Sequence, residues 1–540
     1  MENTSYFSFN EKLCFALGDA SANIAWRGVA TFLTIFYTDV FGLTPASVGL
    51  LMFICRFSDG VSDVAMGMIG DRTKSKYGHF RPWILWTAIP LGVILSLLFT
   101  TPDWSYEMKL VYAYTTYILF TLIYTANNIP YGALMAVMTP NENERTSLGS
   151  FRMMGAFTGG MLVQGSLLAL VAYFGNVNPT IDLEQKAETE YVVTVSSPEN
   201  VKNAKINTQH GLFDVQVAKF QMVGDTAAPT LGKSFEMKAG EKYTFTITGE
   251  SDLTKDNISL INQSTGYSNS MYIMSAILAL CMFLTFWGTR ERVAPDEKQE
   301  DNLLQDLKDL VKNKPWFILL VVGLGFNIYN NLKTGIIAIY FTHYVGNAAL
   351  AGIYFVALML ISIVAAMITP SLSKKFGKKN VFIGSMIATS IVNSLLYFFG
   401  PTQILMIFAV GITSELFAAI LPTLFFGMLG DAADYGEKVF GRRATGLVYS
   451  AGSFATKFGG GIAGAIIGAV LGLYGYDGQD SSAIQNAVPG IINLMSWIPA
   501  VICLAFTFVM SFYPITSVAE ATAPNIKDDS TDLTINNENK

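Results

Sequence analysis

Two carboxylates stand one helical turn apart inside an apolar stretch that runs from about residue 46 to about residue 69. Asp59 and Asp63 are four residues apart, so a helix places both side chains on one face, and Arg56 lies one turn earlier. A charge at mid-membrane depth costs roughly 2.5 to 3.5 kcal/mol. Such a cost favours a purpose, and two neighbouring carboxylates can hold a small cation. In the structural alternative, Arg56 or a neighbouring helix neutralises the pair and holds the bundle together.

The composition is typical of a membrane protein. Of the 540 residues, 51% are hydrophobic and 14% are charged, whereas soluble domains usually carry about 25% charged residues. The lipid bilayer is therefore an expected partner and nucleic acid is not, and the net charge of −6 adds little. All four cysteines lie in apolar runs and are expected to be buried thiols, and no His/Cys cluster has metal-ligand spacing.

Twelve apolar runs predict an all-α membrane protein with twelve transmembrane helices. Most of the runs are 20 residues or longer, which is enough to cross a bilayer. The runs cover about 13–40, 48–70, 83–101, 110–138, 148–174, 267–288, 316–344, 349–369, 379–399, 402–428, 445–474 and 488–513.

Lysine and arginine are concentrated in alternate connections between these runs. The connections 41–47, 345–348, 400–401 and 475–487 contain neither residue. The positive-inside rule therefore predicts that both termini are cytoplasmic, in a cell or inner membrane. The basic residues in the other connections are Arg72, Lys74, Lys76, Arg81, Arg290, Arg292, Lys298, Lys308, Lys312, Lys314, Lys374, Lys375, Lys378, Lys379, Lys438, Arg442 and Arg443.

Two short echoes indicate an internal repeat of six runs. Phe36-Tyr37-Thr38-Asp39-Val40-Phe41-Gly42 resembles Tyr340-Phe341-Thr342-His343-Tyr344-Val345-Gly346, and the Gly70–Gly78 segment resembles Ser371–Lys379. Both echoes relate run n to run n+6. They predict two six-helix halves with a binding site between them near the membrane midplane.

The connection 176–266 is long, polar and rich in strand-forming residues, as in Tyr191–Val195 and Lys242–Thr248. It predicts a small β-rich extracytoplasmic insertion, most simply a sandwich, which is either a lid or docking surface for a partner or an inert insertion. The expected N-terminal half consists of the first five helices in 1–175, the insertion in 176–266 and the sixth helix in 267–288. A cytoplasmic linker, 289–315, is expected to be either an amphipathic helix or a solvated chain. The second half is expected in 316–514, followed by a polar cytoplasmic tail in 515–540.

Several motifs in order resemble the glycoside–pentoside–hexuronide:cation symporters, the branch of the major facilitator fold that includes melibiose permease. The resemblance covers nearly all the chain except 176–266 and the tails. It implies uptake of a sugar with Na⁺, H⁺ or Li⁺ by alternating access, with no cofactor. The motifs are Gly18-Asp19 with Asn23, Phe36 to Leu43, Arg56 with Asp59 and Asp63, Gly70-Asp71-Arg72-Thr73, Phe80-Arg81-Pro82-Trp83, Asp434-Tyr435-Gly436-Glu437 and Arg443-Ala444-Thr445-Gly446.

The resemblance also implies site residues. It implies a cation site of Asp59 and Asp63, with Ser62 in place of a family asparagine and Thr125 from the fourth run. Such oxygen ligands suit hard cations such as Na⁺, and carboxylates also carry protons, so Na⁺ and H⁺ both stay open. Lys457 matches a family lysine between the sugar and cation regions, and Arg152 matches a family arginine near the sugar. Asn23 and Asn128 stand where melibiose permease has aspartates, which keeps a sugar plausible and removes repulsion toward an anion.

Basic residues within the spans extend this prediction to an acidic sugar, such as a uronide. Arg27 lies one turn past Asn23, and Lys333 lies in the middle of the seventh run. Arginine pairs well with a carboxylate. Alternatively, Arg27 or Lys333 pairs with Asp19, Asp39 or Glu415 as a strut or gate. Aromatic residues, including Trp26 and Tyr124, are candidates for a sugar-stacking platform or for ordinary packing.

Charged residues near the helix ends are candidates for gates, and they fit ordinary solvated loops equally well: Asp39, Arg145, Asp431, Asp434, Arg442 and Arg443. Two other functions share the fold: a lipid or lysolipid transporter, and a non-transporting membrane sensor. Intramembrane acids together with a lysine favour a transporter over a sensor. An enzyme is not expected, because 176–266 shows no nucleophile motif and no metal spacing.

Overall fold

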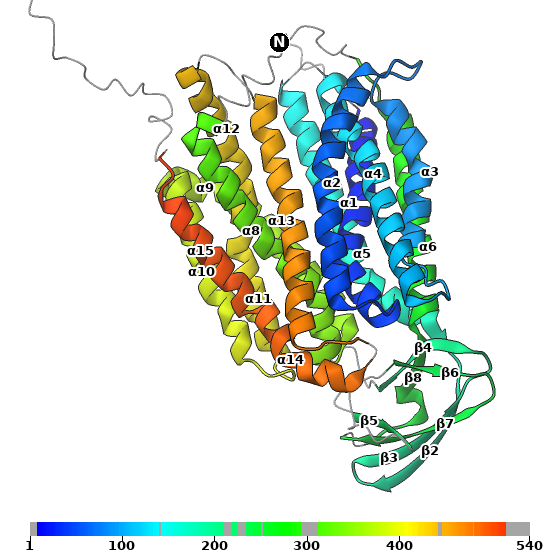
Figure 1. Cartoon of the computed structure of the whole chain (residues 1–540). Coiled ribbons are helices and arrows are strands. Elements are labelled where there is room, and N and C mark those ends of the chain that lie inside the picture. Colours follow the sequence, from blue (N-terminus) through cyan, green and yellow to red (C-terminus); the bar gives the residue numbers. More distant parts are fainter. Residues whose placement is uncertain are drawn as a thin grey trace, which may run out of the picture.

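The computed structural model describes residues 8–139, 142–208, 219–223, 234–249, 252–292, 311–440, 445–478 and 480–514. Long helices form a bundle, and a small group of strands lies at one end of it (Figure 1). The helices are α1 Phe9–Ile35, η1 Phe36–Val40, α2 Pro45–Arg72, α3 Arg81–Leu98, α4 Tyr106–Met138, α5 Glu142–Gly175, α6 Gln263–Gly288, α8 Lys314–Ile339, η3 Tyr340–Val345, α9 Ala348–Phe376, α10 Lys378–Ser394, η4 Leu395–Phe398, α11 Ile404–Ala418, α12 Ile420–Phe440, α13 Thr445–Leu473, α14 Ser481–Met495 and α15 Trp497–Ser511.

All twelve predicted runs are helical in the part of the chain that the structure describes. Two runs are divided: α11 and α12 together form the tenth, and α14 and α15 form the twelfth. Eight helical segments within the described ranges are long and apolar enough to cross a membrane. The predicted amphipathic helix in the linker falls largely outside the described residues.

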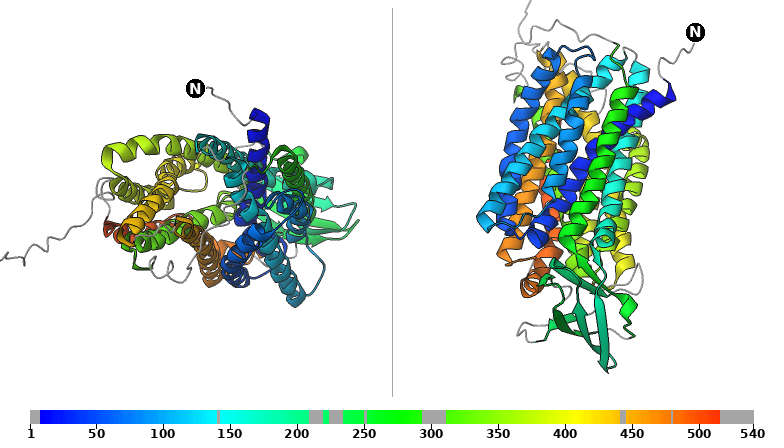
Figure 2. Two further views of the ribbon diagram at one scale, coloured as in Figure 1. Left: turned by 90° about the horizontal axis from the view of Figure 1, so that it is seen from above. Right: turned by 90° about the vertical axis from the view of Figure 1, so that its right-hand side faces the viewer.

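The helices form two groups that lie side by side (Figures 1 and 2). The first group contains α1 to α6 and the second contains α8 to α15. Three pairs of helices carry much of the contact between the groups: α2 with α13, α5 with α9, and α1 with α8. We refer to the groups as the N-terminal and C-terminal halves.

The predicted internal repeat corresponds to a shared local structure. α1 continues into the π-helix η1, and α8 continues into the π-helix η3. Each is followed by a glycine with positive φ, Gly42 at 83° and Gly346 at 82°, a conformation that glycine adopts without steric cost. The equivalent backbone bonds Leu43 N–H to Tyr37 O and Asn347 N–H to Phe341 O also match, at 2.8 and 3.0 Å.

The strands between α5 and α6 form two four-stranded sheets. One has the order β1-β8-β4-β6 and the other β2-β3-β7-β5. The predicted strands Tyr191–Val195 and Lys242–Thr248 are confirmed, because they lie in β3 and coincide with β7. Val193, Val195 and Ile247 are fully buried in a core between the sheets. The strands are β1 Asn176–Val177, β2 Thr180–Ala187, β3 Glu190–Ser196, β4 Val201–Thr208, β5 Lys219–Met222, β6 Ser234–Met237, β7 Lys242–Thr248 and β8 Ile258–Asn262, with the short helix η2 Lys255–Asn257 before β8.

The two halves touch backbone to backbone at the end that carries the strands, which we call the insertion end. In α2 and α13, a Cβ atom built on Gly49 would lie 3.1 Å from the Gly464 carbonyl oxygen. In α5 and α9, a Cβ atom on Gly352 would lie 2.4 Å from the Gly165 carbonyl oxygen. Small residues allow membrane helices to approach this closely, and these two crossings hold the halves together at the insertion end.

We predict that Gly352→Ala destabilises this closed arrangement. The added methyl group would collide with the α5 backbone, which cannot move as a side-chain tip can. The midpoint of thermal unfolding in detergent should fall by several degrees. Gly384→Ala in α10 is the matched control, because its Cβ would meet nothing within 4 Å, and alanine favours a helix by about 1 kcal/mol over glycine. Equal midpoints for the two variants would contradict the prediction.

Candidate substrate cavity and cation site

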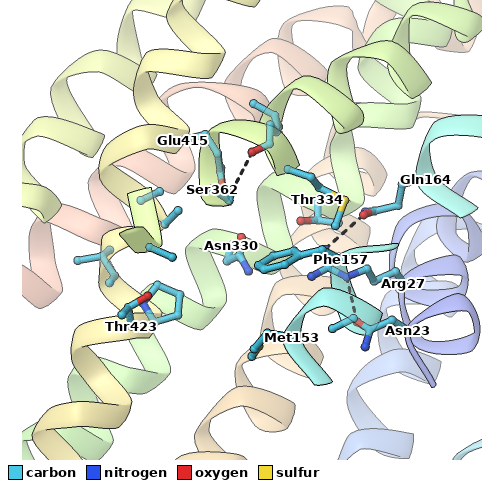
Figure 3. A pocket seen from close by; sticks show the side chains of 18 of the residues that line it. Asn23, Arg27, Met153, Phe157, Gln164, Asn330, Thr334, Ser362, Glu415 and Thr423 are labelled. Atoms are coloured by element: carbon cyan, nitrogen blue, oxygen red, sulfur yellow. Dashed lines mark hydrogen bonds between the residues drawn. The ribbon is translucent and has the colours of Figure 1, made fainter. Parts of the chain in front are cut away.

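A cavity of about 830 Å³ lies between the two halves (Figure 3). Its walls come from α1, α4 and α5 in the N-terminal half and from α8, α9, α11 and α12 in the C-terminal half. Met153 and Phe426, which line the cavity, are exposed. At the insertion end the two halves touch backbone to backbone. Its polar and charged lining residues are Asp19, Asn23, Arg27, Tyr124, Asn128, Arg152, Gln164, Tyr329, Asn330, Lys333, Thr334, Ser362, Glu415 and Thr423.

Arg27 is held in the cavity wall by neutral partners. Its Nε donates to Asn23 Oδ1 at 3.1 Å, and its Nη1 donates to Gln164 Oε1 at 3.3 Å (Figure 3). Gln164 in turn donates to Thr31 Oγ1 at 2.8 Å, which fixes its orientation. No carboxylate of the described residues lies within ion-pair distance of Arg27. The guanidinium is thus oriented by neutral partners and forms no direct ion pair with a described carboxylate.

Arg152 differs from Arg27, because its Nε pairs with Asp19 Oδ1 at 3.2 Å. The sequence predicted Arg152 near the substrate, and it does line the cavity, as does Asn128. Tyr124 also lines the cavity and stacks on Trp26, with the ring centroids 5.3 Å apart. Trp26 itself supports that wall from behind the lining residues.

The opposite wall of the cavity carries Lys333 and Glu415. The ammonium of Lys333 is 2% exposed and donates to Tyr329 Oη and to Ser414 Oγ, both at 3.4 Å. The carboxylate of Glu415 accepts a hydrogen bond from Ser362 Oγ at 2.9 Å. From the sequence, Glu415 was expected only as a partner of a basic residue. A carboxylate inside the apolar run 402–428 was the feature that could have indicated a functional residue there. Gln164 and Ser362 had no such feature, because they are single neutral residues in apolar runs.

The candidate cation site lies where α2 and α4 of the N-terminal half meet α13 of the other half. Thr125 Oγ1 donates to Asp63 Oδ1 at 3.1 Å, as the resemblance implied. Lys457 of α13 forms an ion pair with the same carboxylate. Lys457 is outside the described cavity lining. Ser62 is half-buried on α2, and the side chain of Asp59 lies outside the described residues.

A buried polar cluster joins the halves at the insertion end. Asp39 Oδ2 lies 2.5 Å from His343 Nε2, and Asp39 Oδ1 accepts from Tyr476 Oη at 2.7 Å. Asp39 and His343 occupy equivalent positions of the two sequence echoes, so the repeat brings them together. All three side chains are less than 10% exposed. The cluster therefore links the two halves at this end, and the role of Asp39 as a gate stays a prediction.

The insertion reaches this cluster through β4. Asn203 Nδ2 donates to the Val40 carbonyl oxygen at 2.8 Å. Lys205, 9% exposed, lines a small cavity with Asp39 and with residues of both halves. Burial lowers the pKa of Lys205, and the nearby Asp39 carboxylate opposes that shift. The strands therefore rest on the contact between the halves.

The chain matches the family model described as MFS/sugar transport protein over residues 14–197 and 219–517. It belongs to this family of transporters. It is 28% identical over 513 residues to the isoprimeverose transporter of Lactiplantibacillus pentosus, with 94% of this chain and 89% of that protein covered. It is 28% identical over 520 residues to the inner membrane symporter YicJ of Escherichia coli, with 94% of this chain and 92% of that protein covered. It is 26% identical over 509 residues to the glucuronide carrier protein homolog of the same organism, with 93% of this chain and 92% of that protein covered.

Solved structures show the same fold for this transporter. A bacterial homolog of the human lysosomal transporter Spinster, in an inward-facing and unoccupied conformation, superimposes with a TM-score of 0.61 at 11% identity. The match covers 94% of this chain and 98% of that one. The transporter is therefore a multi-pass membrane protein of the major facilitator fold and not an enzyme, with a β-rich region added.

Asp431, a further gate candidate, lies toward the end opposite the insertion. Asp431 of α12 pairs with Lys378 at the start of α10, at 2.6 Å. This contact lies within the C-terminal half and does not join the two halves. The side chains of Arg145, Asp434, Arg442 and Arg443 lie outside the described residues, so their part in a gate stays a prediction.

We predict that Lys457→Met raises the apparent affinity of the transporter for Na⁺. Lys457 and an incoming cation compete for Asp63, so its removal leaves that carboxylate unpaired. The free energy of unfolding in Na⁺-free buffer should fall by about 1–3 kcal/mol. Breaking a fully buried ion pair costs more than this, but the side chains of Lys457 and Asp63 are partly exposed to solvent, which reduces the cost. Thermal unfolding measured against Na⁺ concentration tests both effects.

Lys378→Met is the matched control, because it removes the same charge from an ion pair at the far end of the C-terminal half. Its Na⁺ dependence should equal that of the wild type. A Lys457→Met protein with unchanged Na⁺ dependence would contradict the assignment of the cation site.

Proposed function

We propose that this transporter is a cation-coupled symporter that imports an acidic glycoside, such as a uronide, by alternating access. The insertion end faces the outside of the cell, and both termini are cytoplasmic. In this orientation the described conformation is inward-facing. It is closed outside by the Asp39 cluster and the glycine crossings, and its cavity opens toward the cytoplasm.

The observation that carries the proposal is Arg27, an oriented guanidinium that faces the cavity without a carboxylate partner among the described residues. Burying a charge in a low-dielectric site costs free energy unless an opposite charge accompanies it. A substrate carboxylate supplies that charge and suits the planar fork of arginine. Asn23 and Asn128, which line the same wall, suit the hydroxyl groups of a sugar ring.

The relatives support this substrate class. One carries the name of an isoprimeverose transporter, which fits a glycoside, and another that of a glucuronide carrier homolog, which fits a glycoside with a carboxylate. The asparagine and arginine side chains of the cavity favour such a hydrophilic ligand over a lipid, although the fold is compatible with both.

Cation coupling follows from competition at Asp63. In the empty carrier Lys457 neutralises Asp63 and bridges α2 of one half to α13 of the other. A Na⁺ ion or proton that binds at Asp63, with Asp59, Ser62 and Thr125 as further ligands, releases Lys457 from this bridge. Loss of this bridge frees α2 and α13 to move relative to each other as the substrate binds, and linkage requires that cation and sugar raise each other's affinity by the same factor.

Asp63→Cys should abolish the accumulation of substrate against a gradient, because the cation loses its principal ligand. Exchange of labelled for unlabelled substrate across the membrane should persist, since it needs the cavity but no net ion movement. Both are measured in the same vesicles, and Asp431→Cys at the far ion pair serves as control. Normal accumulation by Asp63→Cys would refute the site.

Arg27→Gln should lower uptake of a labelled uronide by about tenfold or more, the cost of removing one partner of a buried charge pair. Uptake of the matched neutral glycoside should fall less, because its hydroxyl partners remain. Arg290→Gln, which removes an exposed guanidinium outside the cavity, is the control. A wild-type transporter that prefers the neutral glycoside would overturn the acidic substrate.

A further inference from the structure

The described lining of the cavity contains three cations, Arg27, Arg152 and Lys333, and two carboxylates, Asp19 and Glu415. Asp19 belongs to Arg152, with which it forms an ion pair. The remaining group consists of Arg27, Lys333 and Glu415, which come from helices of both halves. We call it the charge triad, and it carries one net positive charge.

Glu415 lines the same cavity as the two cations of the triad and contacts neither directly. No ion pair within 4.0 Å joins Glu415 to a described residue, yet it interacts electrostatically with both Lys333 and Arg27. The ammonium of Lys333, on α8, donates to Ser414 of α11, which is the residue before Glu415. The ammonium therefore lies beside the turn of α11 that carries the carboxylate. Glu415 therefore balances one of the two positive charges of the triad. The second positive charge remains in the cavity without a described carboxylate to balance it.

The carboxylate of Glu415 is positioned by its own hydrogen bond. Ser362 Oγ lies 2.9 Å from Glu415 Oε1 and 2.8 Å from the Leu358 carbonyl oxygen. Around it stand Tyr329 of α8 and the fully buried Tyr354 of α9, both of which interact with it electrostatically. These neighbours are neutral, so the charge of the triad depends on three side chains alone.

We propose that Glu415 sets the number of negative charges that the substrate carries, and limits it to one. This inference rests on the proposed import of an acidic glycoside. A substrate with one carboxylate brings the triad to neutrality, whereas a substrate with two negative charges leaves one of them uncompensated between the helices. Such a residue excludes sugar phosphates and dianionic uronides while admitting a monoanionic uronide.

Three p-nitrophenyl glycosides that differ only at C6 test the inference: the glucoside, the glucuronide and the glucoside 6-phosphate, with charges of 0, −1 and about −2 at pH 7.5. Their binding is measured by competition with a labelled uronide on the purified full chain in Na⁺ buffer. Glu415→Gln is nearly isosteric and removes only the charge. It should raise the affinity for the phosphate relative to the glucuronide by about tenfold or more.

Two further variants make the result independent of any one substitution. Lys333→Gln leaves the triad neutral and should shift preference to the uncharged glucoside. The double variant Glu415→Gln with Lys333→Gln again carries one positive charge, from Arg27, and should recover the preference of the wild type for the glucuronide. Glu415→Asp, which keeps the charge, is the control and should keep the wild-type order.

The outcomes separate the inference from the proposed function. If the wild type prefers the neutral glucoside, the acidic substrate itself fails. If the wild type prefers the glucuronide and a Glu415→Gln protein that still shows Na⁺-dependent binding keeps the phosphate-to-glucuronide ratio within about twofold, the role of Glu415 fails. The role of Glu415 also fails if the double variant does not regain the preference for the glucuronide. That result would show that residues outside the triad determine the charge selectivity.

Discussion

The structure depends on the requirement that every charge placed between apolar helices finds an opposite charge or a set of hydrogen bonds. Asp63 meets it with Lys457, and Asp39 meets it with His343 and Tyr476. In both cases the partners come from different halves. The pairs therefore do more than neutralise charge, because each also joins the two halves of the bundle.

Close backbone contact supplies the rest of the closure at the insertion end. The glycine crossings of α2 with α13 and of α5 with α9 contain no charge, and they hold only while the helices stay at their present separation. Opening this end separates these surfaces and also removes His343 and Tyr476 from Asp39. Lys205 of the insertion stays with the N-terminal half, so Asp39 keeps a positive neighbour when the halves part.

The fold was largely predictable from the sequence, because length and hydropathy alone define the helical runs and strand-forming residues mark strands such as β3. The repeat was also visible, since two echoes shared one register. Direct pairing between distant charges was not predictable: Lys457 and Asp63 are 394 positions apart, and the family resemblance placed Lys457 near the cation region without pairing it with Asp63. The π-helical ends also left no sign in composition. Gln164 and Ser362 were missed because a single neutral residue in an apolar run is usually ordinary packing.

Helix α1 connects the cavity to the Asp39 cluster, two places that the sequence patterns indicated separately. Asp19, Asn23 and Arg27 recur every four residues and face the cavity, and the same rod ends in the π-helix that carries Asp39. A π-turn shifts the register of the residues that follow it, and it turns Asp39 toward the C-terminal half at the point where the equivalent π-turn presents His343. Arg27 in the cavity wall and Asp39 in the cluster between the halves therefore belong to one continuous helical element. Under the proposed function, this single rod would connect substrate binding at Arg27 directly to the contact between the halves at the insertion end.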